Sequence, residues 1–262
     1  MAKTNYNCTE DGFCVIDTVD KKPKVKKSNP LSIRSKKKQG KIIYFGDPMC
    51  SWCWGISENI EKLKNKYSDK LEFELVMGGL RSGGGDPWND QMKEFLRHHW
   101  MQVNAVSGQP FNYDLLAWDE FNYDTEPACR AVRIIRDMAP ALEFDFYREI
   151  QYKFYVDNED PKRSDFYRSI CAKLKIPFKA FRPLFLSSVY CDIVKEDFKR
   201  AMDYGVRGFP TVLLETKDKH TAICTGFATF EQMCDRIEIV LNRGGKVEKI
   251  RKKIRVFGLF NL

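Results

Sequence analysis

The hydrophobic pattern in the first third of the chain predicts a strand, a helix and a second strand in close succession. Residues 41–46 include four consecutive apolar positions, which is typical of a strand buried on both faces. Residues 71–77 alternate between apolar and acidic positions over most of their length, as in a strand with one buried face. Between these segments, residues 51–67 carry apolar side chains at helical spacing. This order predicts a βαβ unit with parallel strands.

A long helical block separates this unit from a second group of strands. Residues 86–204 show apolar positions at helical spacing almost throughout. Strand patterns return at residues 211–214 and 220–224, and the polar residues between them predict the turn of an antiparallel hairpin. A last helix is expected at about residues 229–242. The predicted order is therefore βαβ, a helical block and ββα.

A glycine-rich segment, residues 78–85, follows the second predicted strand. It lacks the Gly-Lys-Ser/Thr sequence of a phosphate-binding loop, so nucleotide binding is not predicted there. We interpret this segment as a connection that leaves the sheet. A contribution of Arg81 to a nearby site is the alternative.

The composition suits a packed globular protein with basic ends. Of the 262 residues, 43% are hydrophobic and 13% are aromatic, and the net charge is +8. There is no apolar run of membrane-spanning length, and the first residues lack the apolar core of a secretory signal, so a cytoplasmic protein is expected. The aromatic residues follow burial periodicity, so no nucleic-acid surface is predicted.

These patterns divide the chain into four parts. Residues 1–40 carry a net charge of +6 and are expected to be a poorly ordered N-terminal extension, and residues 246–262 carry +5 and form a basic C-terminal tail. Residues 41–85 and 205–245 are expected to form one domain that contains the strands, with the helical residues 86–204 inserted into it. The basic ends are either contact sites for acidic partners or solvated segments.

The candidate chemistry lies where the first predicted strand meets the first predicted helix. Cys50 and Cys53 form a Cys-x-x-Cys sequence there, with Cys50 just before the helix or in its first turn. Unpaired backbone N–H groups and the positive end of the helix dipole favour a thiolate, so we expect the pKa of Cys50 to be lowered. Cys-x-x-Cys in this context indicates a thioredoxin-like redox site.

A structural zinc site is the alternative interpretation of the two cysteines. Such a site needs two further ligands at metal spacing, but the chain has no second Cys-x-x-Cys. His98 and His99 are adjacent, so their side chains lie on different sides of a helix. No metal is therefore predicted.

A second cysteine pair lies in the N-terminal extension. Cys8 and Cys14 are separated by five residues that include Gly12, which would allow a tight turn. They are either an accessory dithiol that exchanges with the main pair or two incidental exposed cysteines. The chain has nine cysteines, and this odd count argues against a purely structural set of disulfides.

Four stretches of the sequence together resemble a known family. They are Asp47-Pro48-Met49-Cys50-Ser51-Trp52-Cys53-Trp54-Gly55, Gly78-Gly79-Leu80-Arg81, Ser107-Gly108-Gln109-Pro110-Phe111 and Val206-Arg207-Gly208-Phe209-Pro210-Thr211. With these motifs, residues 41–242 resemble the DsbA-like branch of the thioredoxin superfamily, and most of all its cytoplasmic FrnE-type predicted protein-disulfide isomerases. The resemblance implies an α/β thioredoxin fold with an all-helical domain inserted after the second strand. It also implies that Pro210 has a cis peptide bond and faces the dithiol.

The resemblance implies a thiol-disulfide oxidoreductase, acting as a reductase or isomerase. Cys50 would attack a substrate disulfide and Cys53 would resolve the mixed disulfide. The residues expected to contact the substrate are Trp52, Trp54, Phe209 and Pro210. Trp54 is alternatively a core residue.

No bound cofactor is expected beyond the redox-active disulfide, and glutathione is a candidate co-substrate. The expected partners are protein or small-molecule thiols and disulfides, together with a reducing system, and a homodimer stays open. Ser51-Trp52 is neither the Gly-Pro of thioredoxins nor the Pro-His of the periplasmic oxidant, so the family does not fix the redox direction. A reducing compartment favours reduction or isomerisation over net oxidation.

Two other functions stay open at this point. Kappa-type glutathione transferases and 2-hydroxychromene-2-carboxylate isomerases resemble the chain in topology, but they usually carry a catalytic serine where this chain has Cys50. A non-catalytic redox-sensing or holdase module would bind a partner through exposed tryptophans and the basic tails, and it would use the dithiol as a switch.

Overall fold

A computed structural model describes residues 6–8, 14–16, 38–217 and 219–242. The predicted C-terminal tail, residues 246–262, and most of the predicted N-terminal extension lie outside these ranges. The chain divides into two compact units, Met1–Ser35 and Lys36–Leu262, and each is described by itself.

The first unit contains a short antiparallel hairpin. Strand β1 (Tyr6–Cys8) pairs with β2 (Cys14–Ile16), and the register places the backbone of Cys8 opposite that of Cys14. The side chains of these two cysteines lie outside the described part of the chain. The accessory dithiol therefore stays a prediction.

The second unit is built on a mixed sheet that the described residues form in the order β4-β3-β5-β6. Strands β3 (Gly40–Gly46) and β4 (Leu71–Met77) are parallel, and α1 (Ser51–Tyr67) connects them, which confirms the predicted βαβ unit. Strand β5 (Thr211–Glu215) runs antiparallel to β3 and to β6 (His220–Thr225), which confirms the hairpin. Within the described residues a further helix begins at residue 230, one residue after the predicted start, and continues to residue 242, where the description ends.

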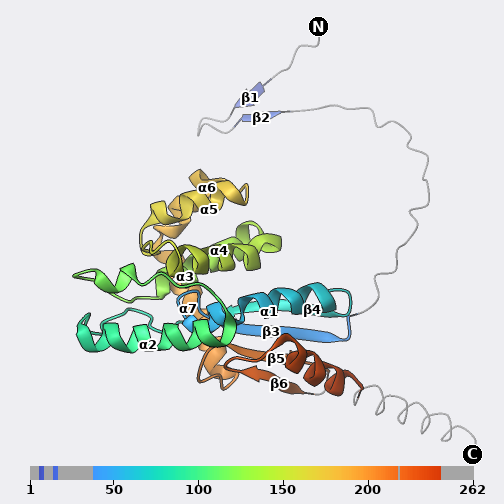
Figure 1. Cartoon of the computed structure of the whole chain (residues 1–262). Coiled ribbons are helices and arrows are strands. Elements are labelled where there is room, and N and C mark those ends of the chain that lie inside the picture. The colour runs from blue at the N-terminus through green and yellow to red at the C-terminus, as the bar shows by residue number, and fades with distance from the viewer. Residues whose placement is uncertain (1–5, 9–13, 17–37, 218, 243–262) are drawn as a thin grey trace, which may run out of the picture. The chain divides into compact units, whose positions relative to one another are not determined.

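The segment between β4 and β5 is helical, as predicted (Figure 1). Its α-helices are α2 (Asp90–Ser107), α3 (Glu126–Met138), α4 (Glu143–Tyr155), α5 (Tyr167–Lys173), α6 (Phe178–Phe185) and α7 (Ser188–Asp203). Short 3₁₀ turns lie at Asp114–Ala117, Pro140–Leu142 and Ser164–Phe166. The chain thus has the expected thioredoxin fold with a helical insertion after β4.

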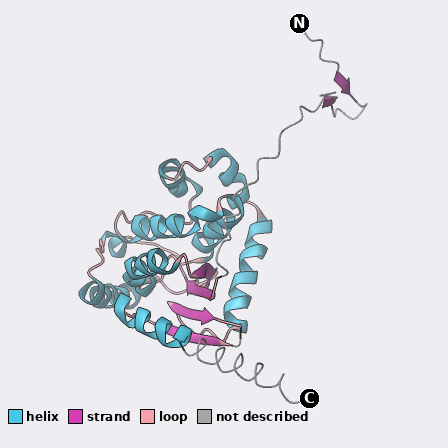
Figure 2. Ribbon diagram, turned by 90° about the vertical axis from the view of Figure 1, so that its right-hand side faces the viewer, coloured by secondary structure: helices cyan, strands magenta, loops and turns pink. Residues whose placement is uncertain are grey.

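Both faces of the sheet are buried, which explains the continuous apolar run in β3. Ile42 and Tyr44 pack into the large core that includes α1, whereas Ile43 and Phe45 pack against Ala201 of α7 on the other face. Figure 2 shows helices surrounding the strands. The strand ends are therefore the places where side chains can meet solvent or a substrate.

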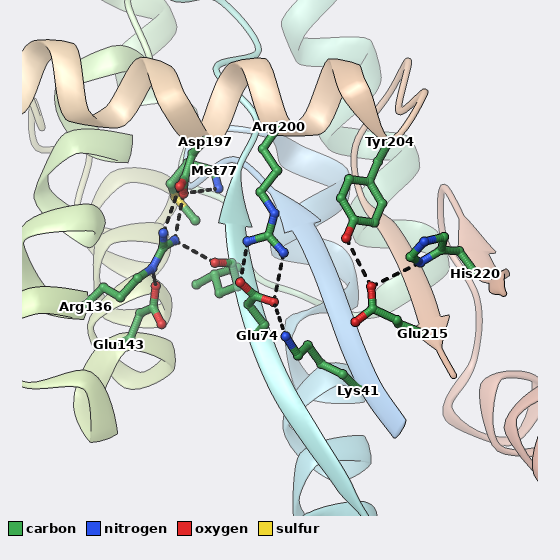
Figure 3. Close-up of polar contacts among 11 residues, drawn as sticks. Lys41, Glu74, Met77, Arg136, Glu143, Asp197, Arg200, Tyr204, Glu215 and His220 are labelled. Atoms are coloured by element: carbon green, nitrogen blue, oxygen red, sulfur yellow. Dashed lines mark hydrogen bonds and ion pairs between the residues drawn. The ribbon is translucent and has the colours of Figure 1, made fainter. Parts of the chain in front are cut away.

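A cluster of charged side chains attaches the insertion to β4, which is an edge strand. Arg136 of α3 binds both carboxylate oxygens of Asp197 of α7 at 2.7 and 2.8 Å, and it also donates to the carbonyl of Leu75 at 2.6 Å (Figure 3). Asp197 in turn accepts from the backbone N–H of Met77 at 2.9 Å. Side chains thus satisfy edge groups that would otherwise need another strand. They also fix the end of β4, from which the glycine-rich segment continues.

Candidate active site

Cys50 lies at the N-terminus of α1, directly after the turn that ends β3. It is the N-cap residue, with extended backbone angles, and its N–H donates to the carbonyl of Asp47 at 3.1 Å. The Trp54 N–H donates to the Cys50 carbonyl at 3.0 Å and begins the helical ladder. The predicted position of Cys50 at a strand-to-helix junction is therefore confirmed.

The two cysteines of the motif differ in access. Both are free thiols in this structure, and Cys50 is 5% exposed while Cys53, inside the helix, is fully buried. Cys50 lines a surface cleft, and Cys53 does not. Only the first sulfur of the pair is thus placed to meet a substrate.

The Phe209–Pro210 peptide bond is cis, as the family resemblance implied. The Cys50 thiol donates to the carbonyl of Phe209 at 3.5 Å, so this loop faces the dithiol across about 160 residues of sequence. Pro210 is buried at the start of β5, whereas Phe209 is half-buried and lines the cleft. The Phe209 ring packs directly over Gly78. The contact is so close that a Cβ atom at position 78 would lie only 2.2 Å from the ring, so the packing requires glycine there.

The cleft beside Cys50 has a volume of about 640 Å³. Its walls come from the Cys50 turn, the cis-proline loop, the glycine-rich segment and the insertion. The apolar and aromatic residues among them include Met49, Trp52, Leu80, Phe95, Trp100 and Phe209. Arg81 also lines the cleft, so the glycine-rich segment contributes to the site as well as connecting the sheet to the insertion.

The two tryptophans of the motif have different surroundings. Trp52 is half-buried, lines the cleft, and has its ring centroid 6.2 Å from that of Phe227. Trp54 is only 2% exposed, stacks on Tyr155 and donates its Nε1 hydrogen to the carbonyl of Pro110 at 3.0 Å. It lies in the core and does not line the cleft beside Cys50, which agrees with the alternative interpretation of Trp54 as a core residue.

A buried carboxyl group, for which the sequence motifs predict no role, lies beside the dithiol. Asp47 is fully buried, and its two oxygens accept from the N–H groups of Met49 and Leu80, each at 2.8 Å. The Cys129 thiol donates to the same carboxyl at 3.4 Å. Burial raises the pKa of Asp47, and these hydrogen bonds act against the rise. The only signal in the sequence was an acidic residue directly after a buried strand.

The insertion also contacts the backbone of the Cys50 turn. Tyr123 is buried, and its hydroxyl donates to the carbonyl of Met49 at 2.8 Å. This carbonyl directly precedes Cys50, so Tyr123 fixes the peptide bond that leads into Cys50. No pattern in the sequence links these two positions, which are 74 residues apart.

The pKa expected for Cys50 from its position at a helix N-terminus is wrong in direction. The neighbouring Cys53 side chain and burial raise the pKa of Cys50 well above its ordinary value. The backbone N–H of Cys53 lowers it, as expected at a helix N-terminus, but this effect is the smaller one. The prediction considered only the local helix geometry and not the burial of Cys50, to which the insertion contributes.

Two further findings concern the described residues only. Among them there is no group of three His, Cys, Asp or Glu side chains that could hold a metal ion. Nor do they contain a helix with the length and apolar character needed to cross a membrane.

Comparison with known proteins identifies the family. The family model of the DSBA-like thioredoxin domain matches residues 41–238. This chain belongs to that family. The DsbA-like chain is 32% identical to a candidate protein disulfide isomerase from Nitrosomonas europaea, with a TM-score of 0.72, over 79% of this chain and 99% of that one.

Two more distant proteins are also similar to this DsbA-like chain. The cytosolic disulfide reductase DsbM from Pseudomonas aeruginosa is 21% identical, with a TM-score of 0.65, over 77% of this chain and 98% of that one. Its structure has also been solved with GSH. The ClpXP adapter protein SpxH from Halalkalibacterium halodurans is 22% identical over 78% of this chain, and the match spans 65% of that protein. At these identities the structural likeness to DsbM shows a shared fold.

Proposed function

We propose that this chain is a thiol-disulfide oxidoreductase that reduces or isomerises disulfides through Cys50 and Cys53. The observation that carries the proposal is the position of the Cys50 thiol. It lines the cleft and faces the carbonyl of Phe209, while Cys53 lies buried three residues further along α1. This arrangement separates an accessible attacking sulfur from a protected resolving sulfur.

The reaction consists of two thiol-disulfide exchanges. The Cys50 thiol loses its proton to solvent, and the thiolate attacks one sulfur of a substrate disulfide. The substrate S–S bond breaks, a Cys50–substrate disulfide forms, and the other substrate sulfur leaves as a thiolate and takes a proton. Cys53 then loses its proton and attacks the Cys50 sulfur. This step forms the Cys50–Cys53 disulfide and releases the second substrate thiol.

Two electrons pass from the dithiol to the substrate in this sequence, so an external thiol must restore the dithiol. Glutathione is the candidate, and the DsbM structure with GSH supports it by analogy. Attack of one glutathione on the Cys50–Cys53 disulfide gives a mixed disulfide, and a second glutathione releases oxidised glutathione. A cytoplasmic location, where the glutathione pool is reduced, is part of the proposal.

The raised pKa of Cys50 favours reduction over oxidation. Strongly oxidising proteins of this superfamily owe their potential to a stabilised reduced form, in which the attacking cysteine is a thiolate. Here the neighbouring Cys53 side chain and burial raise the pKa of Cys50, so its thiol keeps the proton more readily. The reduced form lacks that stabilisation, and the dithiol is correspondingly better at giving up electrons.

Trp52 and Phe209 are the proposed substrate contacts, because both line the cleft and neither is fully buried. Pro210 acts from behind the cleft by fixing the position of the Phe209 carbonyl. An extended substrate segment beside this carbonyl could add main-chain hydrogen bonds.

Insulin reduction with glutathione, glutathione reductase and NADPH tests the proposal. We expect Cys50→Ser to abolish turnover and Cys53→Ser to accumulate mixed disulfides at Cys50. The matched control is Cys191→Ser, which changes a half-buried thiol on α7 outside the site and should leave turnover unchanged. Full reductase activity in the Cys50→Ser protein would overturn the proposal.

The same protein preparations distinguish the two alternatives. A glutathione transferase would conjugate glutathione to an electrophile such as chlorodinitrobenzene. We expect the protein not to increase the rate at which this glutathione conjugate forms, apart from direct alkylation of Cys50 by the electrophile. A redox-sensing module would be oxidised and reduced once, without sustained insulin reduction. Multiple turnovers per protein molecule separate the catalyst from the sensor.

A further inference from the structure

We propose that Cys129, a buried thiol supplied by the insertion, is a positioning residue that donates a hydrogen bond to the Asp47 carboxyl beside the dithiol and thereby modulates the reactivity of Cys50. The inference rests on the proposed function, because it concerns the dithiol of that reaction. It gives a role to a cysteine that takes no part in the disulfide exchanges.

The contact between Cys129 and Asp47 joins the insertion to the redox site. Cys129 lies in the first turn of α3, is fully buried, and donates its Sγ hydrogen to Asp47 Oδ2 at 3.4 Å. Burial and the nearby Asp47 charge raise the pKa of Cys129 well above its ordinary value, so its sulfur keeps the proton that it donates. A buried thiol that only filled space would not need a carboxylate as its neighbour.

The position of Cys129 is fixed at both ends of its helix. Just before α3, the Thr125 N–H donates to the carbonyl of Arg81 at 3.2 Å, and the Cys129 N–H donates to the carbonyl of Thr125 at 3.1 Å. Near the other end of α3, Arg136 binds Asp197 of α7 through two hydrogen bonds (Figure 3). The helix is thus attached to the glycine-rich segment and to the end of β4, and its first turn is held beside the Cys50 turn.

Asp47 depends on a small number of donors. Its backbone donors are the N–H groups of Met49 and Leu80, which belong to the turn and the glycine-rich segment themselves. The side-chain donor is Cys129, at 3.4 Å, and the side chains of Thr125 and Cys129, both from the insertion, lower the pKa of Asp47 against the larger effect of burial. Removing the Cys129 donor leaves a buried carboxylate with one hydrogen bond fewer, which favours its protonated form.

The charge of Asp47 reaches the reacting sulfur. It raises the pKa of several titratable groups, which are Cys50 at the N-cap of α1, Cys129 on α3, Tyr123 before α3, and Tyr147 and Tyr155 on α4. For Cys50, a charged Asp47 disfavours the thiolate, whereas a protonated Asp47 removes this repulsion. Any change that protonates Asp47 at a higher pH therefore makes Cys50 more reactive over the pH range in between.

The test compares three variants of the full chain. Cys129→Val removes the donor and fills the space, Cys129→Ser keeps a donor, and Cys171→Val changes another fully buried cysteine of the insertion, on α5. For each reduced protein, the rate of alkylation by iodoacetamide is measured at Cys50 by mass spectrometry as a function of pH. Because the chain contains several other thiols, only the modified Cys50 peptide is counted.

We expect Cys129→Val to shift the Asp47-linked inflection of the alkylation profile upward by about one pH unit, the scale of a single lost hydrogen bond to a carboxylate. Between the original and the new inflection, Cys50 should react about threefold to tenfold faster than in the unchanged protein. Cys129→Ser and Cys171→Val should keep the original profile. Identical profiles for Cys129→Val and Cys171→Val would overturn the inference, and so would equal shifts in Cys129→Val and Cys129→Ser.

A second measurement on the same samples separates this inference from the proposed function. Each protein is equilibrated with mixtures of reduced and oxidised glutathione, and the Cys50–Cys53 disulfide is quantified. If the unchanged protein forms no such disulfide, the proposed function fails. If the disulfide forms but the pH profile of Cys50 alkylation is the same with and without the Cys129 donor, only the role of Cys129 fails. Should Cys129→Val not fold, Cys129→Ala provides the same loss of donor with less volume.

Discussion

Replacing Gly78 with alanine should disable the site without disturbing the rest of the fold. The Cβ atom of an alanine at this position would lie 2.2 Å from Cζ and 2.4 Å from Cε1 of the Phe209 ring. The ring must therefore move away, and it belongs to the residue whose carbonyl accepts from the Cys50 thiol. The substitution thus displaces the cis-proline loop from the dithiol while changing neither cysteine.

The size of the displacement follows from ordinary contact distances. Non-bonded carbon atoms approach to roughly 3.5 Å, so the ring has to shift by more than about 1 Å. Overpacking of this kind costs about 1–3 kcal/mol of stability. A displacement of about 1 Å at a reacting centre can cost roughly 100-fold in rate. We therefore expect kcat/KM to fall by about 10-fold to 100-fold while the protein stays folded.

The assay is glutathione-coupled insulin reduction, with thermal unfolding measured on each protein. Gly208→Ala is the matched control, because a Cβ atom there meets nothing within 4 Å although Gly208 lies in the same loop as Phe209. It should keep activity within about twofold. A second control is Gly78→Ala in a Phe209→Ala background, where the clash is absent and the substitution should add no further loss. Equal kcat/KM values for Gly78→Ala and Gly208→Ala would refute the argument.

Three further predictions follow from charges near the site. Because the pKa of Cys50 is raised, its alkylation rate should still increase with pH above about 8.5, the usual pKa of a thiol. A rate that reaches its plateau below that pH would contradict the raised pKa of Cys50. Arg136→Met leaves the buried carboxylates of Asp197 and Glu143 without their partner and should cost about 3–5 kcal/mol in urea unfolding, whereas a loss below about 1 kcal/mol would show that the cluster contributes little. The raised pKa of Asp47 means that the folded chain binds this proton more tightly than the unfolded chain, so stability falls as pH rises from about 3.9 through the folded pKa. Relative to Asp47→Asn, the unchanged protein should therefore lose stability over that pH window, and a difference in stability that does not vary with pH would exclude this effect.

The parts of the fold that the sequence predicts well are those set by local periodicity. The bounds predicted for α1 and β4 agree with the structure because their apolar positions repeat regularly and their ends carry clear breaks. The pairing of Cys50 with the Phe209–Pro210 bond was predicted from a combination of motifs and not from periodicity. Its geometry, with a cis bond and a thiol-to-carbonyl contact, agrees with that prediction.

The parts that could not be predicted depend on contacts between distant segments. Trp54 occupies the first turn of α1, where a side chain can face either the cleft or the core. Trp54 lies in the core because its Nε1 hydrogen bonds to the carbonyl of Pro110 and its ring stacks on Tyr155, and both residues belong to the insertion. The direction of the Cys50 pKa was missed for a similar reason, since helix position is local whereas burial results from the whole fold.

These contacts make the helical insertion a part of the site. A separate lid would only cover the dithiol and would open without altering it. Instead, its Tyr123 hydroxyl fixes the Met49 carbonyl and its Cys129 thiol binds the Asp47 carboxyl, so it completes the hydrogen bonding of the turn that carries Cys50. Opening the insertion would leave a buried carboxylate and carbonyl without these donors, which costs free energy at the redox site itself. The chain from Lys36 onward accordingly forms one compact unit, and its unfolding should follow a single transition in which the reactivity of Cys50 and the helical signal change together.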